Sequence, residues 1–143
     1  ESPRLCRGIP FIEERYTAPM ARVVAVVGAS RDRRKYGNKA VRAFLHSGYE
    51  VVPINPEGGI IEGIPAYPSV LDVPRSIDLA TIYVQPTIGE QVIDEIARKG
   101  IEEVWLNPGA DGSRVVARAR ALGLEPILDC SIVGIGEDPA SYS

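Results

Sequence analysis

Residues 22–30 read RVVAVVGAS, and residues 31–39 continue as RDRRKYGNK. The β-branched run suits a strand buried on both faces of a parallel sheet. Gly28 ends that run, and a glycine there permits a sharp turn and close approach of the backbone to a ligand. A helix after such a turn presents unpaired N–H groups at its positive end, which bind phosphate. The stretch therefore predicts the opening of a doubly wound α/β domain with a nucleotide-like ligand.

Strand and helix patterns alternate along the rest of the chain, which is typical of a parallel sheet with right-handed crossovers. We expect a three-layer Rossmann-like doubly wound α/β fold with strand order 3-2-1-4-5-6 and a very short third strand. Strands are predicted at 22–27, 50–55, 64–67, 78–84, 103–106 and 126–128, and helices at 38–47, 87–99 and 112–122, with a helical turn at 69–72. The second helix should carry Ile88, Val92, Ile93 and Ile96 inward.

Length and composition limit the function classes. The 143 residues, 45% hydrophobic and 24% charged, fit one domain over residues 21–143, preceded by an arm over residues 1–20. A net charge of −3 argues against a general nucleic-acid binder. An apolar run of about 18 residues, as a membrane span requires, does not occur. Cys6 and Cys130 are far apart, so we expect reduced thiols and a cytoplasmic protein.

Ligands of such sheets bind at the carboxyl ends of the strands, where the strand order reverses. The residues that follow the predicted strands are therefore the site candidates. They are Gly28, Ala29 and Ser30, then Asn55 and Pro56, then Gln85 and Pro86, and then Asn107, Pro108 and Gly109. The basic loop adds Arg33, Arg34, Lys35, Tyr36 and Gly37.

Two features argue against a standard NAD site. The dinucleotide fingerprint G-x-G-x-x-G is broken, because Ser30 and Arg33 stand at its second and third glycine positions. The second strand ends in Asn55-Pro56, where NAD-binding proteins place an acidic residue for the ribose hydroxyls. A tight turn and a solvated charged loop without a ligand are the alternative interpretation, but several cations beside a helix N-terminus suit several phosphates.

A set of short motifs, in order along the chain, carries a resemblance to a known family. These motifs are VVGAS at 26–30, Tyr36-Gly37, GYEVVPINP at 48–56, Gly63, Tyr67-Pro68-Ser69, Pro74, the strand from Asp78, Val104-Trp105 and Cys130. Over about residues 21–132 the sequence resembles the small stand-alone CoA-binding domain family. That family is similar to the CoA-binding portions of the succinyl-CoA ligase α-subunit and of ADP-forming acyl-CoA synthetases. One difference is that family members commonly read Trp-Leu-Gln where this chain has Trp105-Leu106-Asn107.

The resemblance implies that coenzyme A is the ligand. Its pyrophosphate and 3′-phosphate would lie near the Gly28 turn and the basic loop, with Asn55-Pro56 beside the nucleotide and Gln85-Pro86 toward the pantetheine arm. The ligase relatives work through a phosphorylated histidine in a further domain. The one histidine here, His46, is predicted on the exposed face of a helix, so we expect no catalytic residue.

A metal site is not expected either, since one histidine and two distant cysteines do not form a ligand cluster. Cys130 follows the last strand on the ligand side, and we hypothesise a mixed disulfide between its thiol and the pantetheine end. The alternative is a small buried hydrophobic residue beside Ile127 and Ile132. Asp111 is expected to N-cap the helix after it, and Tyr83 and Trp105 to pack in the core.

Three functions remain open. The first is non-catalytic binding of coenzyme A or an acyl-CoA, with a small molecule as the partner and neither nucleic acid nor membrane involved. The second is an NAD(P)-binding oxidoreductase fragment or redox sensor on the same fold. The third is an interaction module that has lost its ligand.

Overall fold

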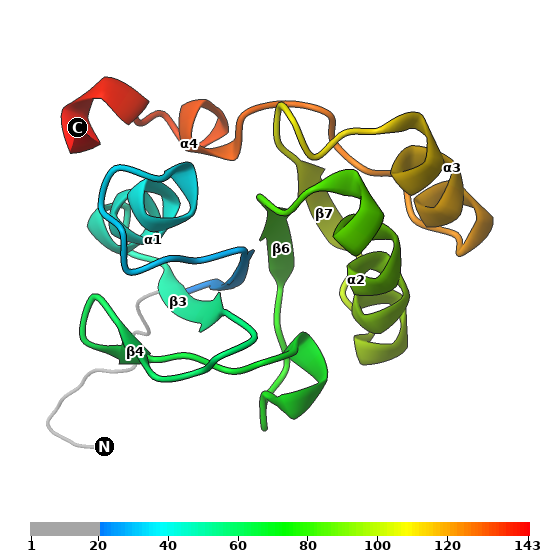
Figure 1. The fold of residues 1–143 in the computed structure, drawn as a ribbon, viewed down its shortest axis with the longest axis horizontal. Helices are drawn as coiled ribbons and strands as arrows, with labels where there is room; N and C mark the ends of the chain where they lie inside the picture. Colours follow the sequence, from blue (N-terminus) through cyan, green and yellow to red (C-terminus); the bar gives the residue numbers. More distant parts are fainter. Residues whose placement is uncertain (1–20) are drawn as a thin grey trace, which may run out of the picture.

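The computed structural model describes residues 21–143, so the predicted arm over 1–20 and Cys6 lie outside the described residues. Its centre is a parallel sheet in the order β3-β2-β6-β7 (Figure 1). The Rossmann-like α/β fold class predicted from the sequence is confirmed, and the VVAVV run forms one of the two inner strands. The bounds are Val23–Val27 for β2, Glu50–Ile54 for β3, Leu79–Ile82 for β6 and Glu103–Leu106 for β7.

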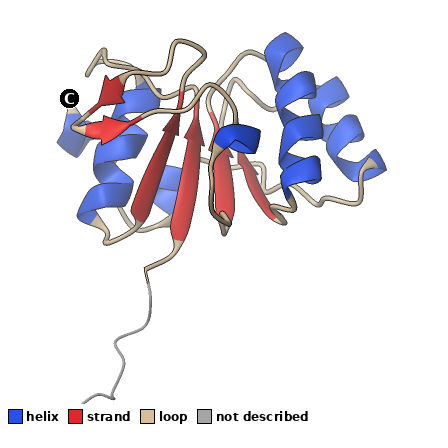
Figure 2. Cartoon of the chain, turned by 90° about the horizontal axis from the view of Figure 1, so that it is seen from below, coloured by secondary structure: helices blue, strands red, loops and turns tan. Residues whose placement is uncertain are grey.

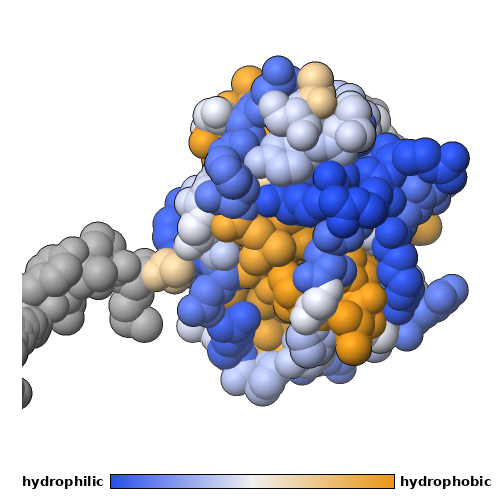
Figure 3. All heavy atoms as spheres, turned by 90° about the vertical axis from the view of Figure 1, so that its left-hand side faces the viewer, coloured by the Kyte–Doolittle hydropathy of each residue, from blue (hydrophilic) through white to orange (hydrophobic). Residues whose placement is uncertain are grey.

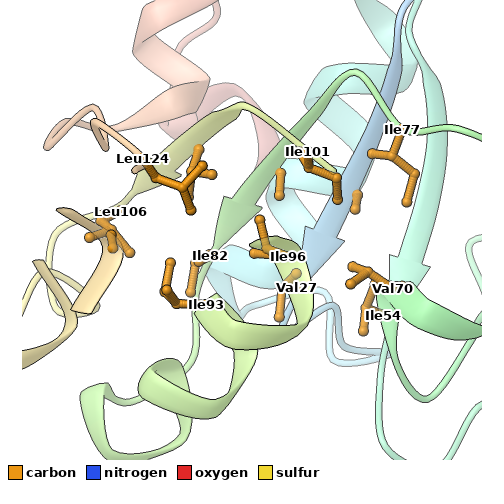
Figure 4. Close-up of a cluster of buried hydrophobic side chains, with 14 of the residues drawn as sticks. Val27, Ile54, Val70, Ile77, Ile82, Ile93, Ile96, Ile101, Leu106 and Leu124 are labelled. Carbon is orange, nitrogen blue, oxygen red and sulfur yellow. The ribbon is translucent and has the colours of Figure 1, made fainter. Parts of the chain in front are cut away.

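Helices cover both faces of this sheet (Figure 2). Helix α1, Tyr36–His46, covers one face, and α2, Pro86–Lys99, with α3, Ser113–Ala121, covers the other. The alternation of β2 side chains explains the two layers: Val24 and Val26 pack toward α1, whereas Ala25 and Val27 pack toward α2 and α3. Figure 4 shows the second of these clusters, in which Val27 and Ile82 of the sheet meet Ile93 and Ile96 of α2.

The two outermost strands of the predicted order are shorter than expected. Residues 64–67 meet β3 at one parallel bridge, Ile54 with Tyr67, and residues 126–128 meet β7 at one bridge, Trp105 with Ile127. Ile64 and Pro65 instead form β5, Ile64–Pro65, which pairs antiparallel with β4, Ile60–Ile61. The sheet therefore has four strands, with single bridges at the places of strands three and six.

Three short helical segments complete the described fold. The short 3-10 helix η1, Val70–Asp72, confirms the helical turn predicted at 69–72. The segments α4, Ser131–Gly134, and η2, Pro139–Tyr142, were not predicted. Helix α1 begins at Tyr36 rather than Asn38. The segment η2 packs on α1, where Arg42 Nη2 donates to the Tyr142 carbonyl at 2.6 Å.

Two side-chain predictions were wrong. Ile88 does not point into the core: it is 52% exposed, because it lies in the first turn of α2, at the ligand edge of the sheet. Asp111 does not cap α3, whose N-cap is Gly112 without a side-chain hydrogen bond; its Oδ1 instead accepts the Gly109 N–H at 3.2 Å. His46 is exposed on α1, as predicted.

The face at the left of Figure 1 gathers hydrophobic side chains below a band of hydrophilic ones (Figure 3). Helix α1 and the β4–β5 hairpin lie on this side, and their exposed hydrophobic residues include Leu45 and Ile60. Among residues 21–143, helices with the length and apolarity needed to cross a bilayer are absent.

Candidate functional site

A pocket of about 810 Å³ lies at the carboxyl ends of the parallel strands. This is the edge of the sheet at which the sequence pattern predicts the ligand. The pocket brings together most of the candidates from four separate parts of the chain, and leaves out Arg33, Arg34 and Pro86. The candidates on its lining are Gly28, Ala29, Ser30, Lys35, Tyr36, Gly37, Asn55, Pro56, Gln85, Asn107, Pro108 and Gly109.

The turn after β2 is held from behind by β3. The N–H groups of Gly28 and Ala29 both donate to the Ile54 carbonyl, at 3.1 and 3.2 Å. Asn55 Nδ2 donates to the Ala29 carbonyl at 3.0 Å, and Asn55 Oδ1 accepts the Glu57 N–H at 2.8 Å. The Asn55 amide is therefore bonded at both ends, to the turn after β2 and to the turn that begins at Asn55 itself.

The first turn of α1 packs directly on that turn. Gly28 has a φ of 92°, which favours glycine, and a Cβ at Gly37 would lie 2.0 Å from the Gly28 carbonyl oxygen. Helix α1 has no acidic residue in its first turn, and its N-cap, Lys35, supplies no side-chain acceptor. The helix thus presents its positive end to the pocket without an acidic residue of its own in that turn.

The cations of the basic loop have different positions. Lys35 lies on the pocket lining. Arg34 forms an ion pair with Asp32 at 3.0 Å, and hydrogen bonds from the Arg34 side chain and backbone lower the pKa of Asp32 to about 2. Arg33 pairs with Glu62 at 2.7 Å. Ligand contact by Arg33 and Arg34 therefore stays a prediction, with carboxylates as their present partners.

Asn107 is the centre of a buried polar network behind the pocket. Its Nδ2 donates to Thr81 Oγ1 at 2.6 Å and to the Ile82 carbonyl at 2.9 Å, and its Oδ1 accepts the Ser131 N–H at 2.8 Å. The Thr81 and Ser131 hydroxyls are 2.7 Å apart. Asn107 therefore joins β6 and the end of β7 to the start of α4.

Tyr83 and Cys130 both line the pocket. The Tyr83 hydroxyl is 3.1 Å from Ser131 Oγ, and burial raises the pKa of Tyr83 to about 12. Cys130 is half-buried and precedes α4, so both of its interpretations are compatible with its position. The mixed disulfide stays a prediction.

Sequence reasoning missed several residues that line the pocket. Tyr83 packs against the core, as predicted, but β6 ends at Ile82 rather than at residue 84, so Tyr83 and Val84 also line the pocket. Recognition of that earlier end would have identified them. Pro139 had no sequence signal, since the chain returns to the pocket only through tertiary contacts. The missed lining residues are Tyr83, Val84, Ile88, Ala110 and Pro139.

Groups of three or more histidine, cysteine or acidic side chains that could hold a metal are not found in the described part of the chain. Within it, the side chains gathered at the pocket are amides, hydroxyls, one thiol and one lysine, together with apolar groups. This arrangement suits a ligand with anionic and neutral polar parts.

Comparison with known proteins gives a consistent result. The model of the family described as "CoA binding domain" matches residues 22–136. The alpha subunit of ADP-forming acetate–CoA ligase I of Pyrococcus furiosus is 34% identical over 136 residues, which is 84% of this chain and 29% of that protein. The chain spans less than a third of the length of the curated relatives it matches.

Solved structures agree. A conserved hypothetical protein from Pyrococcus furiosus superposes with a TM-score of 0.72 and 32% identity, covering 80% of this chain and 99% of that one. A dinucleotide-forming acetyl-coenzyme A synthetase 1 of Ca. Korarchaeum cryptofilum, in its apo form, gives a TM-score of 0.65 and 32% identity, covering 73% of this chain and 25% of that one. The matched family model spans the whole sheet and all of the pocket lining except Pro139, and the chain therefore belongs to the CoA-binding domain family.

Proposed function

We propose that this chain binds coenzyme A, or an acyl-CoA, in the pocket at the carboxyl ends of its strands, and catalyses no reaction of its own. The observation that carries the proposal is the pairing of the Gly28 turn with the open first turn of α1. Two backbone segments approach as closely as glycines allow, and the pocket of about 810 Å³ opens beside them. A volume of this order is typical of sites for small ligands and cofactors.

The phosphates of coenzyme A fit the turn end of the pocket. Ser30 and Lys35 line it there, and the positive end of α1 faces it. Lys35 is exposed and supplies the cation on the lining. In this proposal the pyrophosphate lies against the Gly28 turn and Lys35, while Arg33 and Arg34 add positive charge next to it.

The neutral pantetheine arm fits the opposite end. Gln85, Pro108 and Cys130 offer amide, backbone and thiol groups there, between apolar surfaces. An arm composed of amides and methylenes is matched by such a lining. The free thiol of the ligand would then lie on the side of Cys130.

The alternative of an NAD(P)-binding protein has less support. An acidic residue at the end of the second strand accepts the ribose hydroxyls of NAD. Here that place belongs to Asn55, whose Nδ2 donates to the Ala29 carbonyl and whose Oδ1 accepts the Glu57 N–H. A residue engaged in this way leaves the ribose hydroxyls without their usual acceptor.

Calorimetric titration with coenzyme A, dephospho-CoA and NADH tests the proposal. We expect binding of coenzyme A, weaker binding of dephospho-CoA, which lacks the 3′-phosphate, and no measurable binding of NADH. A preference for NADH would favour the oxidoreductase alternative, and no binding of any of the three would favour an interaction module. Mass spectrometry of small molecules that copurify with the chain provides an independent check.

A further inference from the structure

Glu62 occupies an unfavourable backbone position in the β4–β5 hairpin. Glu62 and Gly63 form the two-residue turn, with φ values of 50° and 78°. Two-residue hairpin turns with positive φ favour asparagine, aspartate and glycine, because other side chains are strained there. Within residues 21–143, Glu62 is the single non-glycine residue with a positive φ. The turn chemistry alone does not account for a glutamate.

The contacts of the Glu62 carboxylate explain why a glutamate occupies this turn. Oε1 accepts from Arg33 Nη1 at 2.7 Å, and Oε2 accepts from Asn38 Nδ2 at 3.0 Å. The side chain of Glu62 is 19% exposed, whereas that of Arg33 is 62% exposed. An ion pair this open contributes little stability by itself. The bond to Asn38, which is fully buried, is the better protected of the two.

Asn38 connects Glu62 to the loop over residues 30–35. Besides Glu62, its Nδ2 donates to the Ser30 carbonyl at 2.9 Å, and its Oδ1 accepts from Arg42 Nε at 2.7 Å. Arg42 in turn donates to the Arg33 carbonyl at 2.8 Å. Residues 30 and 33 of the loop are thus fixed to one network whose anionic member comes from the hairpin.

We propose that Glu62 is a positioning residue. Through Arg33 and Asn38 it holds the loop over residues 30–35, and with it the phosphate-binding turn, in the binding geometry before the ligand arrives. This inference rests on the proposed function. It explains why the hairpin accepts backbone strain: the carboxylate has to reach both Arg33 and Asn38, and the shorter asparagine that the turn favours cannot span that distance. Strained residues are commonly retained where they serve a site.

The test is the substitution Glu62→Asn, which suits the turn and removes the contacts. We expect coenzyme A to bind about tenfold more weakly, in line with the loss of hydrogen bonds to a charged group. Hydrogen exchange of the amides of residues 30–36 should become faster in the free protein. The unfolding midpoint should stay near that of the wild type, because relief of the turn offsets the acceptor that the buried Asn38 amide loses. A merely structural role would instead lower the midpoint and leave the affinity unchanged.

Glu57→Asn is the matched control, since Glu57 is exposed beside the pocket and its change removes the same charge. Its affinity and loop exchange should equal those of the wild type. Wild-type affinity in Glu62→Asn would overturn the positioning role. If the wild type and Glu57→Asn both fail to bind coenzyme A, the proposed function fails. The positioning role of Glu62 is then tested by hydrogen exchange alone. Equal exchange rates of residues 30–36 in Glu62→Asn and in the wild type would overturn it.

Discussion

A Cβ at residue 37 would lie 2.0 Å from the carbonyl oxygen of Gly28, so only glycine at position 37 lets α1 start against the turn after β2. This contact ties the strand that begins the fold to the helix end that faces the pocket. The fold and the site therefore depend on the same pair of glycines.

Gly37→Ala should consequently damage both. The added methyl group meets backbone rather than a flexible side chain, so α1 or the turn has to shift, and overpacking of this kind costs about 1 to 3 kcal/mol. We expect a lower free energy of unfolding by urea and weaker binding of coenzyme A. Gly89→Ala is the control, because a Cβ there meets the Val115 side chain at 3.3 Å rather than a backbone oxygen at 2.0 Å. Wild-type stability of Gly37→Ala would contradict the contact.

Lys35→Ala tests which cation of the loop serves the ligand. Lys35 lines the pocket, whereas Arg34 is paired with Asp32 outside the lining. We expect the loss of Lys35 to weaken binding of coenzyme A by about 1 to 2 kcal/mol, as for a charge-assisted phosphate contact, without a change in fold. Arg34→Ala, the matched change one residue away, should weaken it less. A larger loss in Arg34→Ala would place the phosphates farther out along the loop.

Local patterns were sufficient to predict the central sheet and the ligand edge. The β-branched run at residues 23–27, the glycine that ends it and the periodic helices fix strands, turn and crossovers from near neighbours in sequence. The residues that follow each strand could then be assigned to one edge, because parallel strands end together.

Pairings between distant segments could not be predicted in this way. Arg33 was assigned to phosphate, yet its partner Glu62 comes from a hairpin that the sequence suggested only as a brief edge. The lining by Pro139 depends on the C-terminal segment returning over α1, which the Arg42 bond to the Tyr142 carbonyl stabilises. Neither contact has a local signal, since each depends on how the whole chain packs.

Asn107→Ala should destabilise the protein strongly for a residue next to a binding site. The change removes the acceptor of the buried Ser131 N–H and the donor to Thr81, and unsatisfied buried groups cost about 1 to 3 kcal/mol. Urea unfolding should show this loss, with faster hydrogen exchange at residues 131–134. Gln85→Ala is the control, because Gln85 lines the same pocket but is exposed. An equal effect of both substitutions would mean that the network adds nothing.

Tyr83 should make the stability depend on pH in the alkaline range. Burial raises the pKa of Tyr83 from 10.0 to about 12, so the folded state favours the neutral phenol. Its contribution is fully present below pH 10, the pKa of the unfolded chain, and is lost as the pH rises through 12. Two pKa units correspond to roughly 2 to 3 kcal/mol. Urea unfolding of the wild type and Tyr83→Phe between pH 8 and pH 12 measures it: the wild type should lose stability relative to the variant above pH 10. A difference between the two proteins that stays constant over this range would show that Tyr83 ionises as freely in the folded chain as in the unfolded one.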